Sequence, residues 1–212
     1  MSQPAPALSG RRAQAARNDE AILAAAREVF LADPKAPIAA VAERAGVGIS
    51  ALYRRYAGKE DLLRRLCHDG LRRFLAEAEA ALERGGEVDG WTALAGFLEA
   101  VVVADVHSLT VHLAGTFTPT EEMSADARRS GVLTAELLDR ARQSGRLRAD
   151  VVIGDLELVL EGCAAVRVAD PARTEVLRRR YLALLLAGFA DDGPPLPGPG
   201  PEAGELSRRW RG

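Results

Sequence analysis

Residues 38–53 read IAAVAERAGVGISALY, and this stretch decides the fold of the chain. Two short segments with helical apolar spacing flank a single turn, the pattern of a helix-turn-helix. Close crossing of two helices needs a small side chain midway along the first, and Ala42 supplies it. The turn needs a residue that tolerates a positive φ, and Gly46 supplies that. The inward-facing residues that lock the pair are then Val41, Ala45, Val47 and Leu52.

The N-terminal part has an apolar period near 3.6 and no alternating pattern typical of a strand. Asn18 or Asp19 can cap a first helix, which ends at Asp33 because the residue before a proline disfavours helical geometry. Pro37 suits the first turn of the second helix. The predicted helices run over residues 18–33, 37–45, 48–55 and 59–84.

The C-terminal part predicts four or five more helices, four of them at residues 91–106, 120–144, 151–168 and 171–189. A less regular stretch, 107–119, separates the first two. Thr120, Asp150 and Asp170 are the predicted N-caps. The last two helices are apolar on more than one face, which favours a homodimer through residues 151–189. Full burial of these residues within a monomer is the alternative.

These patterns predict an all-α chain with four parts. Residues 1–17 form a flexible basic arm, and residues 18–57 form the helix-turn-helix domain. Residues 58–190 form a helical ligand-binding and dimerisation domain. Residues 191–212 hold five Pro and five Gly, a composition that predicts a disordered tail.

Charge is distributed unevenly along the chain. Residues 1–66 hold 11 Lys and Arg against 7 Asp and Glu, so the remainder holds 17 against 23. A basic N-terminal third favours a polyanionic partner, although ordinary surface variation is the alternative. The chain shows no secretory signal and no apolar run long enough to span a membrane, so we expect a cytoplasmic protein with no membrane partner. Cys67 and Cys163 are then buried thiols and not a disulfide.

Residues 41–63, VAERAGVGISALYRRYAGKEDLL, together with the preceding AILAAAREVFLAD, resemble the DNA-binding signature of the TetR family. The match covers about residues 18–63; residues 117–119 and 145–151 resemble more weakly the C-terminal regions of actinobacterial members. The resemblance implies a three-helix DNA-binding unit, a long linking helix and a helical ligand-binding, dimerising domain. Two positions depart from the family pattern. Ala36-Pro37 replaces a phosphate-binding Thr or Ser, and Ser50-Ala51 replaces a Gly-Thr pair.

The second helix of the motif fits the major groove, where base edges can be read. Because Leu52 faces inward, Ser50 and Arg54 share the exposed face, and we expect Arg54 to contact a guanine edge or a phosphate. Ser50 would meet a base and Ala51 a thymine methyl. The resemblance implies phosphate contacts for Tyr53 and Lys59, with Tyr56 in the core. The predicted DNA-binding residues are Arg44, Gly48, Ser50, Ala51, Tyr53, Arg54, Arg55 and Lys59. Alternatively, Arg54 and Arg55 are a solvated pair.

The implied function is a ligand-responsive, sequence-specific transcriptional repressor. A dimer would place two recognition helices about 34–36 Å apart or slightly more on a palindromic double-stranded operator. A small-molecule effector would change that spacing by moving the linking helix, 59–84. The candidate pocket residues are Trp91, Phe97, Val101, His107, His112, Phe117, Met123, Leu137 and Cys163.

Other functions were weighed against this one. His107 and His112 are five positions apart and do not share a helix face, so we expect no metal site. Phosphate-binding glycine loops and a nucleophile elbow are absent from the sequence, so we expect no enzyme and no cofactor. A helical protein-interaction module and a transcriptional activator that uses the same helix-turn-helix are the alternatives.

Overall fold

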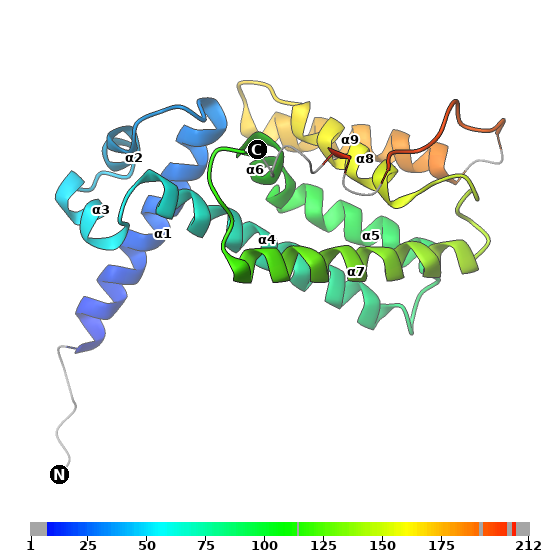
Figure 1. Ribbon diagram of the computed structural model, residues 1–212, viewed down its shortest axis with the longest axis horizontal. Coiled ribbons are helices and arrows are strands. Elements are labelled where there is room, and N and C mark those ends of the chain that lie inside the picture. Colours follow the sequence, from blue (N-terminus) through cyan, green and yellow to red (C-terminus); the bar gives the residue numbers. More distant parts are fainter. Residues whose placement is uncertain (1–7, 114, 191–192, 203–204, 207–212) are drawn as a thin grey trace, which may run out of the picture. The chain divides into compact units, whose positions relative to one another are not determined.

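The computed structural model describes residues 8–113, 115–190, 193–202 and 205–206. Within these ranges the chain forms nine α-helices and no strand, as the apolar period predicts (Figure 1). Their bounds are α1 Leu8–Ala32, α2 Ile38–Arg44, α3 Ile49–Arg55, α4 Lys59–Arg84, α5 Gly90–Val103, α6 Val106–Leu113, α7 Glu121–Gln143, α8 Ile153–Ala165 and α9 Pro171–Phe189. The predicted all-α fold class is confirmed.

The start of the first helix was predicted wrongly. α1 begins at Leu8, ahead of the predicted cap at Asn18 or Asp19, so residues 8–17 are helical rather than a flexible arm. These residues lack an apolar period but are rich in Ala and Arg, which are strong helix formers. Adding turns to a helix that has already nucleated costs little, so propensity is sufficient here. Residues 1–7 of the expected arm lie outside the described residues.

The chain divides into two compact units, Met1–Leu66 and Cys67–Gly212, and the division falls within α4. The sequence placed its domain boundary slightly earlier, between residues 57 and 58. Unit 1 has a small core of its own from α1 to α4. Its fully buried side chains are Ala26, Phe30, Val41, Leu52 and Leu62.

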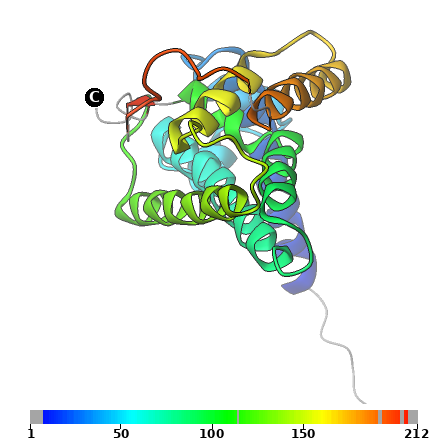
Figure 2. The ribbon, with the colours of Figure 1, turned by 90° about the vertical axis from the view of Figure 1, so that its right-hand side faces the viewer.

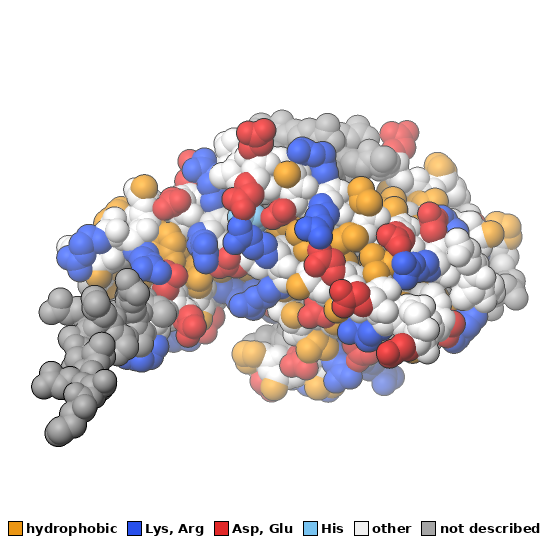
Figure 3. All heavy atoms as spheres, turned by 90° about the horizontal axis from the view of Figure 1, so that it is seen from below, with side chains coloured by type: hydrophobic (Ala, Val, Ile, Leu, Met, Phe, Trp, Pro, Cys, Tyr) orange, Lys and Arg blue, Asp and Glu red, His pale blue; other side chains and the backbone are white. Residues whose placement is uncertain are grey.

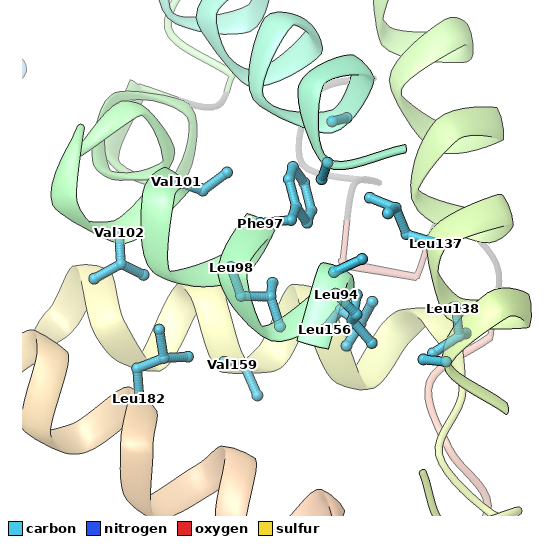
Figure 4. Close-up of a cluster of buried hydrophobic side chains, with 14 of the residues drawn as sticks. Leu94, Phe97, Leu98, Val101, Val102, Leu137, Leu138, Leu156, Val159 and Leu182 are labelled. Carbon is cyan, nitrogen blue, oxygen red and sulfur yellow. The ribbon is translucent and has the colours of Figure 1, made fainter. Parts of the chain in front are cut away.

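The core of unit 2 is centred on α5. Leu94, Phe97 and Leu98 are fully buried and pack against Leu137 of α7 and Leu156 of α8 (Figure 4). Figure 1 shows α5 running between α7 and the α8–α9 pair, and Figure 2 shows α8 and α9 side by side. Apolar burial on this scale is what stabilises a helical domain.

The stretch 107–119, predicted as irregular, contains helix α6. Val106, Leu109 and Leu113 are buried at helical spacing, which the sequence analysis overlooked. Asp105 joins α5 to α6 with a φ of 51°, so the two helices meet at a bend of 68°. Among the described residues no single helix is long and apolar enough to cross a membrane, although this bent pair reaches the required length and apolarity when taken together.

Two of the three predicted N-caps are confirmed. The Thr120 side chain accepts a hydrogen bond from the Met123 amide at 3.1 Å, and Asp170 accepts one from the Ala172 amide at 3.0 Å. The third prediction, Asp150, was wrong, because α8 begins only at Ile153 and ends at Ala165. Arg148 draws the Asp150 carboxylate away, with Nε to Oδ1 at 2.7 Å.

Part of the expected disordered tail is held against unit 2. The Arg148 guanidinium donates to the Pro194 carbonyl at 2.7 Å, and the Leu196 amide donates to Asp150 at 2.9 Å. Pro201 lies so close to Gly154 that a Cβ on this glycine would stand 2.6 Å from the proline Cβ. Prolines lose little backbone entropy on ordering, so a few contacts suffice to hold residues 193–202.

Candidate DNA interface

The turn between α2 and α3 has the geometry that the sequence predicts. Gly46 has a φ of +65°, which favours glycine, and the Val47 amide donates to the Ala42 carbonyl at 3.0 Å. Ala42 is 3% exposed, so its small side chain lies where α2 meets its neighbours. Gly48 precedes α3 in an extended conformation, and its carbonyl accepts from the Ala51 amide at 2.8 Å.

Helix α3 buries one side chain and exposes a polar face. Leu52 is fully buried, whereas Ser50, Tyr53 and Arg54 are exposed. Tyr53 is 53% exposed despite its aromatic ring. Within the part of the chain that the structure describes, Arg54 makes no hydrogen bond or ion pair. The exposed face is therefore available to an anionic partner.

Two other predicted DNA-binding arginines are held by carboxylates of α1. Arg44 donates from Nε to Glu28 at 2.6 Å, and both side chains are more than half exposed. Arg55 donates from Nε to Asp19 Oδ1 at 2.7 Å. Arg44 and Arg55 are therefore partly engaged by these carboxylates, although each guanidinium has further N–H donors that could meet phosphate.

Tyr56 follows α3 and is only 5% exposed, in agreement with its predicted core role. Its hydroxyl donates to Asp19 Oδ1 at 2.5 Å, so Tyr56 and Arg55 share one acceptor. The hydrogen bond from Arg55 lowers the pKa of the Asp19 carboxyl. Burial, followed by the bond to Asp19, raises the pKa of the Tyr56 hydroxyl. The sequence analysis did not single out Asp19 beyond its capping potential.

Lys59 has an intramolecular role that the resemblance did not suggest. Its ammonium donates to the carbonyls of Pro34 at 2.8 Å and Ala36 at 2.7 Å. It also lies 5.1 Å from the centre of the Phe30 ring, a cation–π distance. Lys59 thus holds the α1–α2 connection, and its phosphate contact stays a prediction.

Most of the predicted effector-pocket residues are buried, and their role in binding an effector stays a prediction. Trp91, Phe97, Val101, Leu137 and Cys163 belong to one packed cluster. Outside that cluster, His107, Phe117 and Met123 are buried and His112 is half-buried. Burial raises the pKa of the Cys163 thiol to about 11.

A depression of about 340 Å³ lies elsewhere, between α4 and α7, and is charged instead of apolar. Arg72 pairs with Glu122 at 2.7 Å, and Arg129 pairs with Glu79 at 2.6 Å, across these two helices. Figure 3 shows basic and acidic side chains interspersed over the face that it presents. The described residues contain no group of three or more side chains that could hold a metal ion.

Some apolar side chains of α8 and α9 lie in the core, and others are exposed at the surface. Val159 and Leu182 are buried, whereas Leu158, Val176 and Leu184 are 46%, 53% and 63% exposed. The ring of Tyr181 packs against Gly162, and a Cβ on this glycine would lie only 3.0 Å from the ring. The glycine therefore allows α8 and α9 to approach each other closely. The pair therefore presents aliphatic side chains to its surroundings.

A helix-turn-helix on a small helical unit, followed by a second helical unit, defines a DNA-binding transcriptional regulator. The model of the tetR family of bacterial regulatory proteins matches residues 22–66, and the model described as "Transcriptional regulator SbtR-like, C-terminal domain" matches residues 89–191. The chain belongs to the TetR family of transcriptional regulators, and its C-terminal region is of the SbtR-like type. Regulators of this family and fold are not enzymes.

Solved structures share the fold. LfrR from Mycobacterium smegmatis, in complex with proflavine, is 22% identical with a TM-score of 0.63, over 85% of this chain and 99% of LfrR. PfmR from Thermus thermophilus is 23% identical with a TM-score of 0.57, over 80% of this chain and 99% of PfmR. SCO0520 from Streptomyces coelicolor is 23% identical with a TM-score of 0.54, over 82% of this chain and 99% of SCO0520. A search of curated protein sequences returned no match.

Proposed function

We propose that this regulator is a cytoplasmic, ligand-responsive repressor that reads a specific operator through α3. The observation that carries the proposal is the exposed face of α3, where Ser50, Tyr53 and Arg54 project while Leu52 is buried. Arg54, which has no hydrogen-bond or ion-pair partner among the described residues, can bond a guanine edge or a phosphate at little cost. Base contacts would set the sequence choice, and phosphate contacts the affinity.

A homodimer through α8 and α9 supplies the second recognition helix. Leu158, Val176 and Leu184 are exposed aliphatic side chains on this pair, and their burial against a second copy is favourable. Two-fold symmetry in the protein then requires a palindromic operator, with half-sites about 34–36 Å apart or slightly more.

An effector would act by binding one separation of the two α3 helices better than another. Coupling of about 1–3 kcal/mol per site is typical of such regulators. Because five of the predicted pocket residues belong to the packed core around α5, an effector that binds them would have to open that core. LfrR, which shares the fold, was solved in complex with the small molecule proflavine.

The test begins with selection of duplexes from a random-sequence library by the natural chain. We expect one palindromic sequence to be enriched and its affinity to fall steeply as salt rises. The Arg54→Ala change should weaken binding to that duplex about tenfold or more, the value of a good base contact. Arg128→Ala is the matched control, since Arg128 is an exposed arginine of α7. Equal behaviour of the two variants would contradict the proposal.

Two further measurements test the finer parts of the proposal. A reporter gene placed behind the selected duplex should be expressed less when the protein is present; increased expression would indicate an activator. A small-molecule library screened for release of the bound duplex should yield compounds that also raise the melting temperature of the free protein. Release by salt alone, with no active compound, would contradict ligand response.

A further inference from the structure

Helix α3 has little of its own to hold it in place. It is seven residues long, and a helix of two turns is unstable without tertiary contacts. Leu52 is its one buried side chain, and Tyr56 is buried just beyond its end. The Gly46 turn holds the N-terminal end of α3 to α2, so the C-terminal end needs a separate anchor.

Asp19 of α1 is that anchor. Its Oδ1 atom accepts from Arg55 Nε at 2.7 Å and from the Tyr56 hydroxyl at 2.5 Å. The Asp19 side chain is only 17% exposed, so water competes weakly for these bonds. Successive residues point in different directions, and one oxygen that receives both side chains therefore sets the position and the rotation of this end of α3.

The other carboxylate that α1 offers to this region makes a weaker link. Glu28 bonds Arg44 of α2, and the two side chains are 56% and 61% exposed. An exposed pair of this kind adds little to stability. Glu28 also accepts hydrogen bonds from one residue, whereas Asp19 accepts them from two residues that are adjacent in the chain.

We propose that Asp19 is a positioning residue that sets the tilt of α3, and with it how Ser50 and Arg54 meet the base edges. The inference rests on the proposed DNA-binding role of α3. It predicts a change in DNA affinity opposite to the change that electrostatic repulsion alone would cause. A carboxylate near the interface repels phosphate and withholds Arg55, so its removal would strengthen DNA binding if charge alone mattered. Loss of the α3 tilt would weaken binding to the specific sequence instead.

The experiment compares two probes, the duplex that the natural chain selects and an unrelated duplex of the same length. For Asp19→Ala we expect about tenfold weaker binding to the selected duplex, equal to about 1.4 kcal/mol. Binding to the unrelated duplex should stay level or rise, because Arg55 becomes available to phosphates. The ratio of specific to non-specific affinity therefore falls at least about tenfold.

Tyr56→Phe provides a second variant that keeps the charge of Asp19 and the buried ring. We expect about a threefold fall in the same ratio, because one of the two hydrogen bonds is lost. Thermal unfolding of each variant reports whether it is folded. If Asp19→Ala does not fold, Tyr56→Phe decides, and an unchanged ratio in that variant overturns the inference.

Glu28→Ala is the matched control, because it removes the same charge from the same helix at an exposed pair. Its effect on the two probes should be equal. The inference is overturned if Asp19→Ala, like Glu28→Ala, changes the affinity for both duplexes equally, whether by strengthening or by weakening it. Failure of the proposed function is distinguishable, because the natural chain would then select no sequence at all, and the inference would fall with it.

Discussion

The two units of the chain each contain an arginine in a surrounding that contrasts with the other, exposed Arg54 in unit 1 and buried Arg178 in unit 2. In unit 1, Arg54 is exposed and has no partner among the described residues, while Arg44 forms an exposed pair. In unit 2, Arg178 of α9 is 4% exposed. It donates to Asp105 at 2.5 Å and to the Val166 carbonyl at 2.9 Å. Arg54 thus faces solvent in unit 1, whereas Arg178 in unit 2 joins α9, the end of α8 and the α5–α6 bend.

Exposed apolar side chains follow the reverse distribution. α8 and α9 present Leu158, Val176 and Leu184, while the exposed face of α3 is largely polar. Polar faces with free cations suit a polyanion, and aliphatic faces suit another protein surface. The difference teaches that each unit exposes what its expected partner would bury.

The largest effect should come from the buried arginine. Arg178→Ala removes the donor to the carbonyls of Ala164 and Val166 and breaks the ion pair with Asp105, which keeps its hydrogen bond from Ser108 Oγ. The change should lower the free energy of unfolding by about 3 kcal/mol. Urea unfolding followed by circular dichroism measures it. Arg180→Ala, at the exposed neighbouring position, is the control and should change stability by less than about 0.5 kcal/mol. A similar loss in both would mean that burial of Arg178 is unimportant.

The aliphatic face should give the next largest effect. Leu184→Glu places a charge where we expect a second copy, and should raise the dimer dissociation constant about 30-fold or more, since a buried leucine is worth about 2 kcal/mol. Analytical ultracentrifugation measures the constant. Val132→Glu in α7 is the control, because Val132 is 67% exposed outside this face. A dimer that tolerates Leu184→Glu but not Val132→Glu would place the interface elsewhere.

The Asp19 cluster should show a smaller, pH-dependent effect. In the folded protein, the pKa of the Asp19 carboxyl lies below its ordinary value of 3.8. The contribution of this carboxylate to stability is therefore complete above pH 3.8 and is lost as the pH falls through the folded pKa. At neutral pH, Asp19→Asn should lower the free energy of unfolding by about 1.5 kcal/mol. That difference should shrink with acidification. A difference that stays constant from neutral to acidic pH would contradict the charged hydrogen bond.

The contact between the tail and α8 should give the smallest change in stability. Gly154→Ala adds a Cβ that collides with Pro201, while alanine favours the helix by up to about 1 kcal/mol, so the net change should be near zero. Proteolysis of residues 193–202 should nevertheless become faster. Gly131→Ala in α7 meets nothing within 4 Å and should stabilise the chain without changing that rate. Equal proteolysis in both variants would mean that the tail is not held at Gly154.

Several local signals were read correctly from the sequence, although the caps predicted at Asp150 and at Asn18 or Asp19 were wrong. The Gly46 turn, the caps at Thr120 and Asp170 and the inward direction of Leu52 were all predicted. Each depends on residues within one or two turns of itself, so a single chain carries the information. α6 was missed because its apolar period is short and lies next to a bend. The residue at the bend with a positive φ is Asp105 and not a glycine, so the sequence carries no glycine to mark the break.

The sequence by itself determined the helix-turn-helix, the all-α class and the family, because turns, caps and apolar periods act between near neighbours. Tertiary structure alone decided which groups meet. Arg55 finds its carboxylate 36 positions away and Arg178 finds one 73 positions away. It also placed five of the predicted pocket residues in one packed core around α5. Such pairings depend on how helices pack, and packing brings together residues whose separation along the chain carries no pattern.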